Sequence, residues 1–240
     1  MLRSIKQIYG NKLGASDGEI GHVKDFYFDD KRWVIRYLVA DTGNWLPGRL
    51  VLISPYAFEV LYPPRKLLLV HLTRKQIENS PSIDSHKPVS RQFEEEYFKY
   101  YGWPDYWQGH GVWGMSGFPI VSENSIPRPG ETVIKASGKS EHSDIHLRSA
   151  QAVLGYQIQT GDEIVGHVID FMMDDKSWVI GQLVVNTGNR FSGKKVSLLP
   201  SQIDRISYEE SKVFVNVTKD AFGQAPAYDA DHANLSPTSH

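Results

Sequence analysis

The residues best suited to chemistry are two histidines, each followed three positions later by an aspartate. His22 precedes Asp25, and His167 precedes Asp170, within the hexapeptides Gly-His-Val-Lys-Asp-Phe and Gly-His-Val-Ile-Asp-Phe. An imidazole held by a carboxylate is the arrangement of a general base. If the hexapeptides are strands, however, side chains three residues apart point to opposite faces. The spacing therefore favours structural histidines over a catalytic dyad.

Two pairs of carboxylates follow the same hexapeptides and raise the question of a cation site. Asp29-Asp30 and Asp174-Asp175 lack the regularly spaced oxygen donors of a calcium-binding loop. An aspartate in a turn instead accepts hydrogen bonds from nearby backbone amides. We therefore predict acidic turns at both places rather than metal sites.

A third cluster of polar side chains lies in and directly after a segment rich in glycine, serine and proline, residues 122–144. Catalysis or metal binding needs side chains that are held rigidly, which a linker of this composition does not supply. The cluster consists of Ser140, His142, Ser143, Asp144 and His146.

The remaining catalytic signatures are missing from the sequence. The chain contains no cysteine, which excludes disulfides, thiolate metal sites and a cysteine nucleophile. It has no glycine-rich phosphate loop after a strand, no His-Glu-x-x-His motif and no nucleophile elbow. We expect no enzyme activity, no bound metal and no cofactor.

The bulk composition limits the classes of partner and the compartment. With a net charge of −2 over 240 residues, the chain has no cationic surplus to bind a nucleic-acid backbone. The first 20 residues contain no apolar run of signal-peptide length. No stretch approaches the roughly 18 apolar residues that a membrane-spanning helix needs. We expect a cytoplasmic protein with no transmembrane segment and no nucleic-acid partner.

The two hexapeptides are part of a longer internal repeat. A shift of 145 positions aligns residues 2–84 with residues 147–229 without a gap, and 28 of the 83 aligned pairs are identical. Two copies of one domain of about 80 residues explain this pattern. The identical segments include Leu2-Arg3-Ser4 with Leu147-Arg148-Ser149, Trp33-Val34-Ile35 with Trp178-Val179-Ile180, and Thr42-Gly43-Asn44 with Thr187-Gly188-Asn189.

Each copy is predicted to consist of short strands separated by turns. The first copy alternates segments rich in β-branched and aromatic residues with turns that contain Asp, Gly or Pro. Thr73 and Gln76 form the pattern of a capping box that opens a short helix. The predicted strands of the first copy are 20–28, 33–40, 50–53, 57–62 and 67–72.

Five or six short strands of this kind predict a small closed barrel, which leaves no exposed sheet edge. A barrel of about 80 residues buries a modest core and gains stability by packing against a second copy. We therefore predict a mainly β protein: two small antiparallel β-barrels, residues 1–84 and 147–229, related by a pseudo-two-fold axis. Residues 85–146 join them as an aromatic helix and linker, and residues 230–240 form a polar tail.

The strand and turn pattern resembles that of the PRC-barrel domain. The resemblance rests on Gly-His-Val-x-Asp-Phe, the acidic turn, Trp-Val-Ile, Thr-Gly-Asn and the final Ser211-Lys212-Val213-Phe214-Val215. It covers roughly 160 of the 240 residues. The family includes the cytoplasmic domain of the photosynthetic reaction-centre H subunit and a domain of a ribosome-maturation factor. This resemblance implies a β-barrel that binds other proteins.

The segment between the copies is predicted to begin with a helix. Ser90 is suited to the N-cap, glutamates 94–96 to the first turns, and Gly102 to the end of the helix. After the helix, glycine and proline are too frequent for regular structure. The spacing i, i+4, i+7, i+8 predicts one shared apolar face for Phe93, Tyr97, Tyr100 and Tyr101.

Ten of the chain's 28 aromatic residues lie between Phe93 and Phe118. They are interpreted in three ways: as a staple across both copies, as a groove for a ligand or partner, or as a membrane-interface contact. The lack of a basic face disfavours the last. The candidate interaction residues are Trp103, Tyr106, Trp107, Trp113, His22 and His167.

The sequence predicts a non-enzymatic adaptor that binds a protein partner. It does not identify this partner, and it allows the chain to form a homo-oligomer. Two alternatives stay open as well. One is a small-molecule binder or enzyme with a pocket between the barrels, lined by Trp103, Trp107 and Trp113. The other, implied only by the resemblance, is support of photosynthetic electron transfer in the manner of the reaction-centre H subunit.

Overall fold

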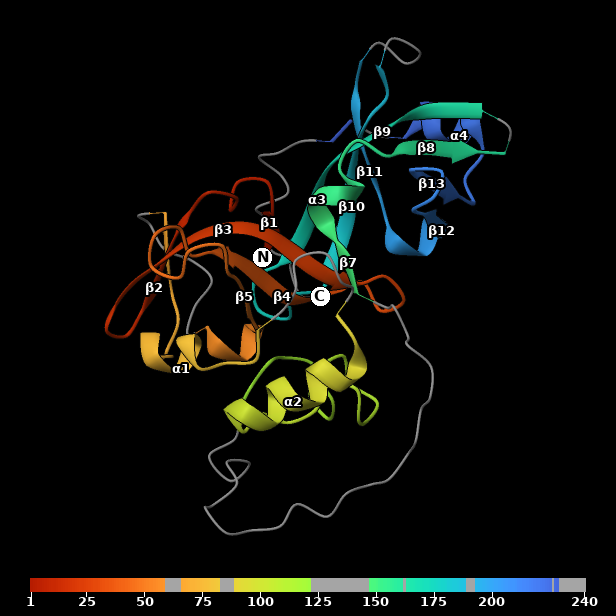
Figure 1. Cartoon of the computed structure of the whole chain (residues 1–240). Helices are drawn as coiled ribbons and strands as arrows, with labels where there is room; N and C mark the ends of the chain where they lie inside the picture. The colour runs from red at the N-terminus through yellow and green to blue at the C-terminus, as the bar shows by residue number, and fades with distance from the viewer. Residues whose placement is uncertain are drawn as a thin grey trace.

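A computed structural model shows a mainly β protein with two sheets (Figure 1). We refer to residues 1–82 as half 1, residues 89–121 as the aromatic arm and residues 147–228 as half 2. The structure describes residues 1–58, 66–82, 89–121, 147–161, 163–188, 193–225 and 227–228.

The first sheet has six strands, of which five come from half 1 and one from half 2. In spatial order, the strands are β5 (Leu50–Ile53), β4 (Val34–Asp41), β3 (Gly18–Asp29), β2 (Lys12–Ala15) and β6 (Leu67–Leu69), with β7 (Leu147–Ser149) beside β3.

The second sheet has seven strands, of which six come from half 2 and one from half 1. In spatial order, the strands are β11 (Lys195–Leu198), β10 (Ile180–Asn186), β9 (Glu163–Asp174), β8 (Gln157–Thr160), β13 (Lys212–Val215) and β12 (Ile203–Ser207), with β1 (Leu2–Ser4) beside β9.

Four short helices complete the fold, and the helix of the aromatic arm is the longest of those that the structure describes. The capping box predicted at Thr73 is confirmed, because its hydroxyl accepts from the Gln76 amide while the Gln76 side chain accepts from the Thr73 amide. The helices are α1 (Arg74–Glu78), α2 (Arg91–Tyr101), α3 (Ala150–Val153) and α4 (Lys219–Gln224).

The predicted closed, antiparallel barrels are not what the described residues form. Each sheet contains one parallel pair, β2 with β6 and β8 with β13. In the part of the chain that the structure describes, the two ends of each sheet are not paired with each other. One end strand of each sheet is bonded by another segment: the Tyr97 hydroxyl donates to the Leu52 carbonyl of β5, and the Tyr228 amide donates to the Lys195 carbonyl of β11. The predicted strand 57–62 lies mostly outside the described residues.

The first strand of each half lies in the sheet of the other half. Leu2 pairs with Asp174, and Leu147 pairs with Asp29, so the same shift of 145 positions relates both donors and both acceptors. The shift also holds at the centre of the molecule. There the Ile35 amide donates to the Trp178 carbonyl at 2.9 Å, and the Ile180 amide donates to the Trp33 carbonyl at 2.7 Å.

The shift of 145 also relates contacts whose residues differ in type. A guanidinium nitrogen of Arg49 donates to the Glu78 carbonyl at the end of α1. The Lys194 ammonium donates to the Gly223 carbonyl in α4. Cations near a helix C-terminus stabilise its unpaired carbonyls, so the two halves use the same device with different side chains.

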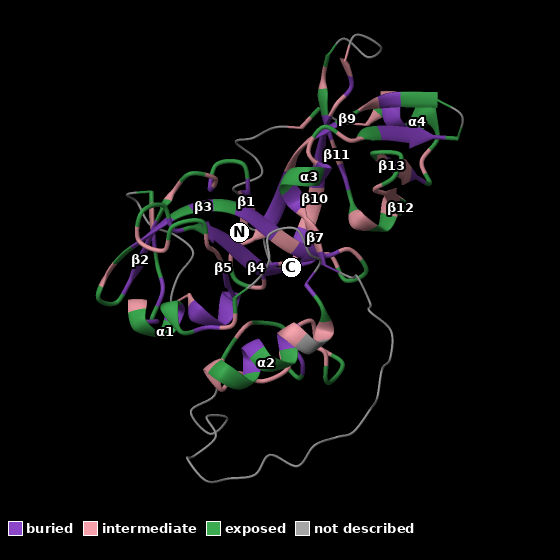
Figure 2. Cartoon of the chain, viewed as in Figure 1, coloured by how far each residue is buried: buried purple, intermediate pink, exposed green. Residues whose placement is uncertain are grey.

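The cores of both halves follow their long central strands (Figure 2). β4 is buried over its first seven residues, and Phe26 and Phe28 of β3 are fully buried. Phe28 and Phe171 of the other half lie with ring centroids 5.5 Å apart, so the two cores meet. The halves therefore share one apolar interior.

We expect Gly21→Ala to destabilise the chain by about 2–3 kcal/mol. A Cβ atom at Gly21, where φ is +134°, would lie 2.0 Å from the Asp41 carbonyl oxygen, beside an irregularity in the β2–β3 register. Gly43, where φ is +54° and a Cβ atom would meet nothing within 4 Å, is the control. Its replacement by alanine should cost only about 1 kcal/mol. Denaturant unfolding measures both, and equal losses would contradict the steric explanation.

Candidate functional site

The repeated hexapeptide places each of its side chains in a different environment. In half 1, Val23 and Phe26 are buried in the core, whereas His22 and Lys24 are exposed. Asp25 is buried, with 8% of its surface exposed. Histidine and aspartate therefore do not form a dyad, as the strand geometry predicts.

The Asp25 carboxylate holds the first strand of half 2. One oxygen accepts from the Ser149 hydroxyl at 2.5 Å, and the other accepts from the Gln151 amide at 3.0 Å and the Phe26 amide at 2.7 Å. Burial raises the pKa of Asp25, and the bond from Ser149 and the two amide bonds act to lower it. The carboxylate thus serves as an acceptor between the two halves.

Asp170 makes the equivalent contacts with the first strand of half 1. Its carboxylate accepts from the Ser4 hydroxyl at 2.5 Å, the Lys6 amide at 3.2 Å and the Phe171 amide at 2.8 Å. Burial raises the pKa of Asp170 as well, against the bonds from Ser4 and the backbone. The recurrence of aspartate in both hexapeptides is explained by these two matching contacts.

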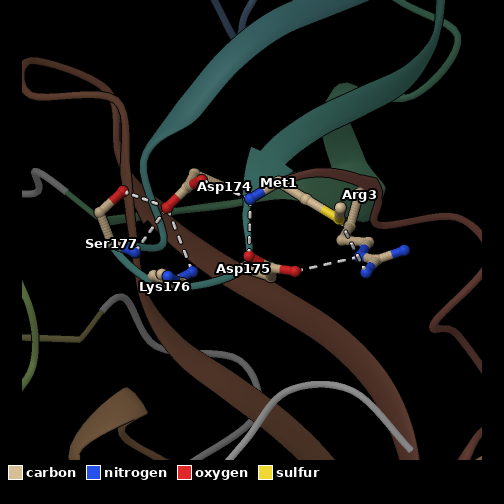
Figure 3. Close-up of polar contacts among 6 residues, drawn as sticks. All are labelled: Met1, Arg3, Asp174, Asp175, Lys176 and Ser177. Carbon is tan, nitrogen blue, oxygen red and sulfur yellow. Dashed lines mark hydrogen bonds and ion pairs between the residues drawn. The ribbon is translucent and has the colours of Figure 1, made fainter. Parts of the chain in front are cut away.

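The acidic turns bind the arginines of the same exchanged strands. Arg3 donates from Nε to Asp175, and Arg148 donates from Nε to Asp30, both at 3.1 Å. Figure 3 shows the first of these pairs, in which both acidic residues of the turn approach the N-terminal strand. In addition, the Arg148 guanidinium stacks on the ring of Tyr208, 4.0 Å from its centroid. The predicted acidic turns are confirmed, and they also join the halves.

The first aspartate of each acidic turn pairs with a different cation. Asp29 accepts from the Lys31 and Arg32 amides of its own turn, and a guanidinium nitrogen of Arg36 lies 3.6 Å from its carboxylate. Asp174 lies 2.9 Å from the ammonium group of Met1 (Figure 3).

Hydrogen bonds and this ion pair control the pKa of Asp174. Partial burial acts to raise it, but the Ser177 amide, the Met1 ammonium group, the Ser177 hydroxyl and the Lys176 amide all donate to the carboxylate. Together these bonds outweigh burial and lower the pKa of Asp174 to about 2.

We expect these aspartates to respond to pH with opposite signs. Raised folded pKa values mean that the contributions of Asp25 and Asp170 are fully present below pH 3.8 and decline as pH rises through the folded pKa. The contribution of Asp174 is present above pH 3.8 and is lost as pH falls through about 2. Unfolding free energies of Asp25→Asn and Asp174→Asn, each relative to the wild type, should therefore change in opposite directions across acidic pH. Parallel pH profiles would contradict this assignment.

The aromatic arm packs on half 1 around a fully buried arginine. The Arg36 guanidinium lies 3.9 Å from the ring centroid of Tyr106 and 4.8 Å from that of Trp113, and it donates to the Val112 carbonyl. Burial lowers the pKa of Arg36, while Tyr106 and Asp29 act to raise it. Two candidate interaction residues, Tyr106 and Trp113, are thus 2% exposed and enclose a cation of the same chain.

A buried carboxylate links the helix of the arm to the sheet. Glu94 is fully buried and accepts from the hydroxyls of Tyr37 at 3.1 Å and Tyr106 at 2.5 Å, and a guanidinium nitrogen of Arg91 lies 3.1 Å from its second oxygen. Glu94 lies in the first turn of the helix, as predicted, but its burial was not predicted. The structure instead uses it to pair buried hydroxyls and a cation.

The apolar face predicted for the helix is therefore partly wrong. Its ends are confirmed, since the Ser90 hydroxyl accepts from the Phe93 amide and Gly102 has a φ of +68°. Tyr97 is buried as predicted, but Tyr100 is 41% exposed, and Phe98 takes its place with 1% exposed. The buried face is rotated because it is centred on the contact with Glu94.

The arm also reaches half 2, in agreement with its interpretation as a staple. The Trp113 ring nitrogen donates to the Ser177 carbonyl at 2.7 Å. Trp107 and Trp103 are half-buried, with ring centroids 5.3 and 6.3 Å from that of Phe98. The arm is a packed element between the halves, and its tryptophans turn toward the protein.

Half 2 offers no equivalent face for the arm. Where half 1 has Arg36, Tyr37 and Tyr56, a shift of 145 positions gives Gly181, Gln182 and Ser201. The guanidinium, phenol and aromatic ring that receive the arm are replaced by a hydrogen atom, an amide and a hydroxyl. The side-chain types therefore explain why the arm packs mainly on half 1.

The two repeated histidines line equivalent open hollows. His22 borders one of about 380 Å³ with Gly21, Thr42 and Gly43. His167 borders one of about 520 Å³, whose lining includes Gly166, Thr187 and Gly188 at the same positions in half 2. Among the described residues, no group of three or more His, Asp or Glu side chains could hold a metal ion. Both histidines are exposed to solvent.

An apolar stretch on the arm is exposed rather than packed. Met115 is 88% exposed, Phe118 45% and Ile120 62%. These three exposed apolar side chains lie within six residues of one another. The candidate interaction residues of the arm all precede this stretch. The stretch itself was not predicted, because single apolar residues in a glycine-rich loop show no periodic pattern.

Comparison with known protein families identifies the domain in half 2. Residues 147–222 match the PRC-barrel domain. The chain carries a PRC-barrel domain. The predicted resemblance is confirmed for this segment, and Asp170, which binds the strand of half 1, lies inside the PRC-barrel domain. Comparison with curated proteins finds no match. In the described part of the chain, no helix has both the length and the apolar character needed to cross a membrane.

Proposed function

We propose that the chain is a non-enzymatic protein-interaction module in which half 1 is a second domain of the PRC-barrel type. The shared shift of 145 positions in strand pairing supports duplication of one domain. The aspartates of the repeated motif act as acceptors between the halves, a structural role that supports an assembly function over catalysis.

The observation that carries this proposal is the exposed apolar stretch on the arm. Met115, Phe118 and Ile120 lie within six residues, and each keeps more than two fifths of its surface exposed. The inner side of the arm is fixed by Trp113, so the outer side is held at a defined place on the molecule. A rigid apolar surface of this kind suits a protein partner with a complementary apolar groove.

Affinity purification from the native cell tests the proposal. The bait is the full chain, compared with a variant that carries Met115→Ser, Phe118→Ser and Ile120→Ser. Leu199→Ser, at a side chain 49% exposed in half 2, is the matched control. We expect one partner to be enriched by the wild type and the control and lost with the triple variant. Equal recovery with all three baits would refute the assignment of this surface.

The twin hollows at His22 and His167 support a second candidate, a small-molecule binder. A ligand that binds only the folded chain raises its melting temperature. A thermal-shift screen with metals, nucleotides and cofactors should then give a shift that His22→Ala and His167→Ala together abolish. A shift that survives both substitutions would place the ligand elsewhere.

A further inference from the structure

Each half carries an acceptor site for a short extended segment, and in this structure the other half of the same chain fills it. The site in half 1 is the edge of β3 at Tyr27–Asp29, beyond the end of β2. The site in half 2 is the equivalent edge of β9, at Met172–Asp174. Backbone pairing at a free strand edge is a general mode of peptide recognition.

Side-chain contacts make these edges selective for Leu-Arg-Ser. The serine hydroxyl and an amide two residues later bind the two oxygens of one aspartate, Asp25 or Asp170. The arginine Nε binds the second aspartate of the acidic turn, Asp30 or Asp175. Leu147 is 5% exposed in its site. Both sites therefore bind the arginine and the serine by the same contacts.

We propose that these sites also bind the Leu-Arg-Ser segments of a second copy of this chain, so that half 1 of one molecule pairs with half 2 of another. Identical donors and acceptors occur in both halves, and every junction contact within one chain can form between two chains. An interface that already exists within a chain is a low-cost route to a dimer. Within one chain, the high effective concentration of the halves favours the closed form.

A charge exchange at Arg148 and Asp30 distinguishes the closed monomer from the dimer in which two chains pair their halves. A full chain with Arg148→Glu places two carboxylates together, and a full chain with Asp30→Arg places two guanidinium groups together. Neither chain makes a matched pair by itself. Between the two chains, however, residue 148 of one and residue 30 of the other carry opposite charges, and the second junction is unchanged.

Sedimentation of the two variants alone and in an equimolar mixture tests the proposal. We expect a monomer from each variant and a particle of twice the mass from the mixture. The control is a single chain with both Asp30→Arg and Arg148→Glu, which restores the pair internally and should remain monomeric at the same concentration. A mixture that sediments as monomers, while the control is folded, would overturn the proposal.

Refolding keeps the test decisive if either variant fails to fold alone. The two variants, carrying different tags, are then mixed in denaturant, refolded together and purified on both tags in sequence. Recovery of a folded particle that contains both tags supports the proposal, and recovery of neither chain in folded form refutes it. The junction between the halves is separate from Met115, Phe118 and Ile120. The proposed dimer and the proposed protein-interaction surface can therefore fail independently.

Discussion

Replacing Glu94 by alanine should lower the unfolding free energy by about 3–5 kcal/mol, the range for removing one partner of a buried charged network. The substitution leaves the Tyr37 and Tyr106 hydroxyls without their acceptor and the Arg91 guanidinium without its carboxylate. The two tyrosines would stay buried, and the loss of a hydrogen bond at a buried hydroxyl costs much more than it does in water.

Glu95→Ala is the control for this loss, because Glu95 is the next residue of the same helix and is exposed. Its replacement should change the unfolding free energy by no more than about 0.5 kcal/mol. Denaturant unfolding followed by tryptophan fluorescence measures both, since Trp103, Trp107 and Trp113 all lie in the arm. Losses within 1 kcal/mol of each other would show that the buried network does not hold the arm.

The strands and the helix ends were predictable because their signals are local. β-branched and aromatic residues between turn residues place β3, β4 and β5 within two residues of their observed bounds. Capping depends on side chains within one helical turn, so Thr73 and Ser90 identify the starts of α1 and α2. Such features need no knowledge of the distant parts of the chain.

The exchange of first strands was not predictable from those signals. Leu-Arg-Ser is too short to show a strand period, and nothing local says which sheet it joins. A non-local signal was present, however: the identical pairs include Arg3 with Arg148, Ser4 with Ser149 and Asp25 with Asp170. Donors and acceptors that must match in two equivalent junctions are under the same constraint, so the junction explains why these pairs are identical.

The face of α2 was mispredicted for a different physical reason. A pattern of apolar residues assumes that carboxylates stay in water, because burial of an unpaired charge is unfavourable. Glu94 is an exception, since Tyr37, Tyr106 and Arg91 supply partners from three places in the sequence. The side chain of Arg36 behaves in the same way, buried between two rings of the arm. The burial of a polar group whose partners come from distant parts of the sequence cannot be predicted from the pattern of a single helix.

These two exceptions and the junction have a common consequence for function. Residues that would suggest chemistry in the sequence, such as the repeated aspartates, have assigned partners in the fold. The repeated histidines at their hollows and the apolar stretch at Met115, in contrast, are accessible. We therefore expect the activity of this chain to depend on its exposed surfaces rather than on its buried polar groups.

Removing both junction carboxylates should have the largest effect on the contact between the halves. Asp25→Ala deprives the Ser149 hydroxyl and the Gln151 amide of their acceptor, and Asp170→Ala does the same to Ser4. With several donors left unmet at each site, we expect a loss of about 3 kcal/mol for each substitution and about 6 kcal/mol for both.

Double-mutant cycles then test the exchange of strands directly. In the observed arrangement, Asp25 contacts Ser149 and Asp170 contacts Ser4, so the paired alanine substitutions should couple by about 1–3 kcal/mol in each cycle. Asp25 with Ser4 is the matched control, because these residues belong to the same half and share no hydrogen bond. That cycle should be additive to within about 0.5 kcal/mol. Coupling between Asp25 and Ser4, with none between Asp25 and Ser149, would mean that each first strand folds back on its own half.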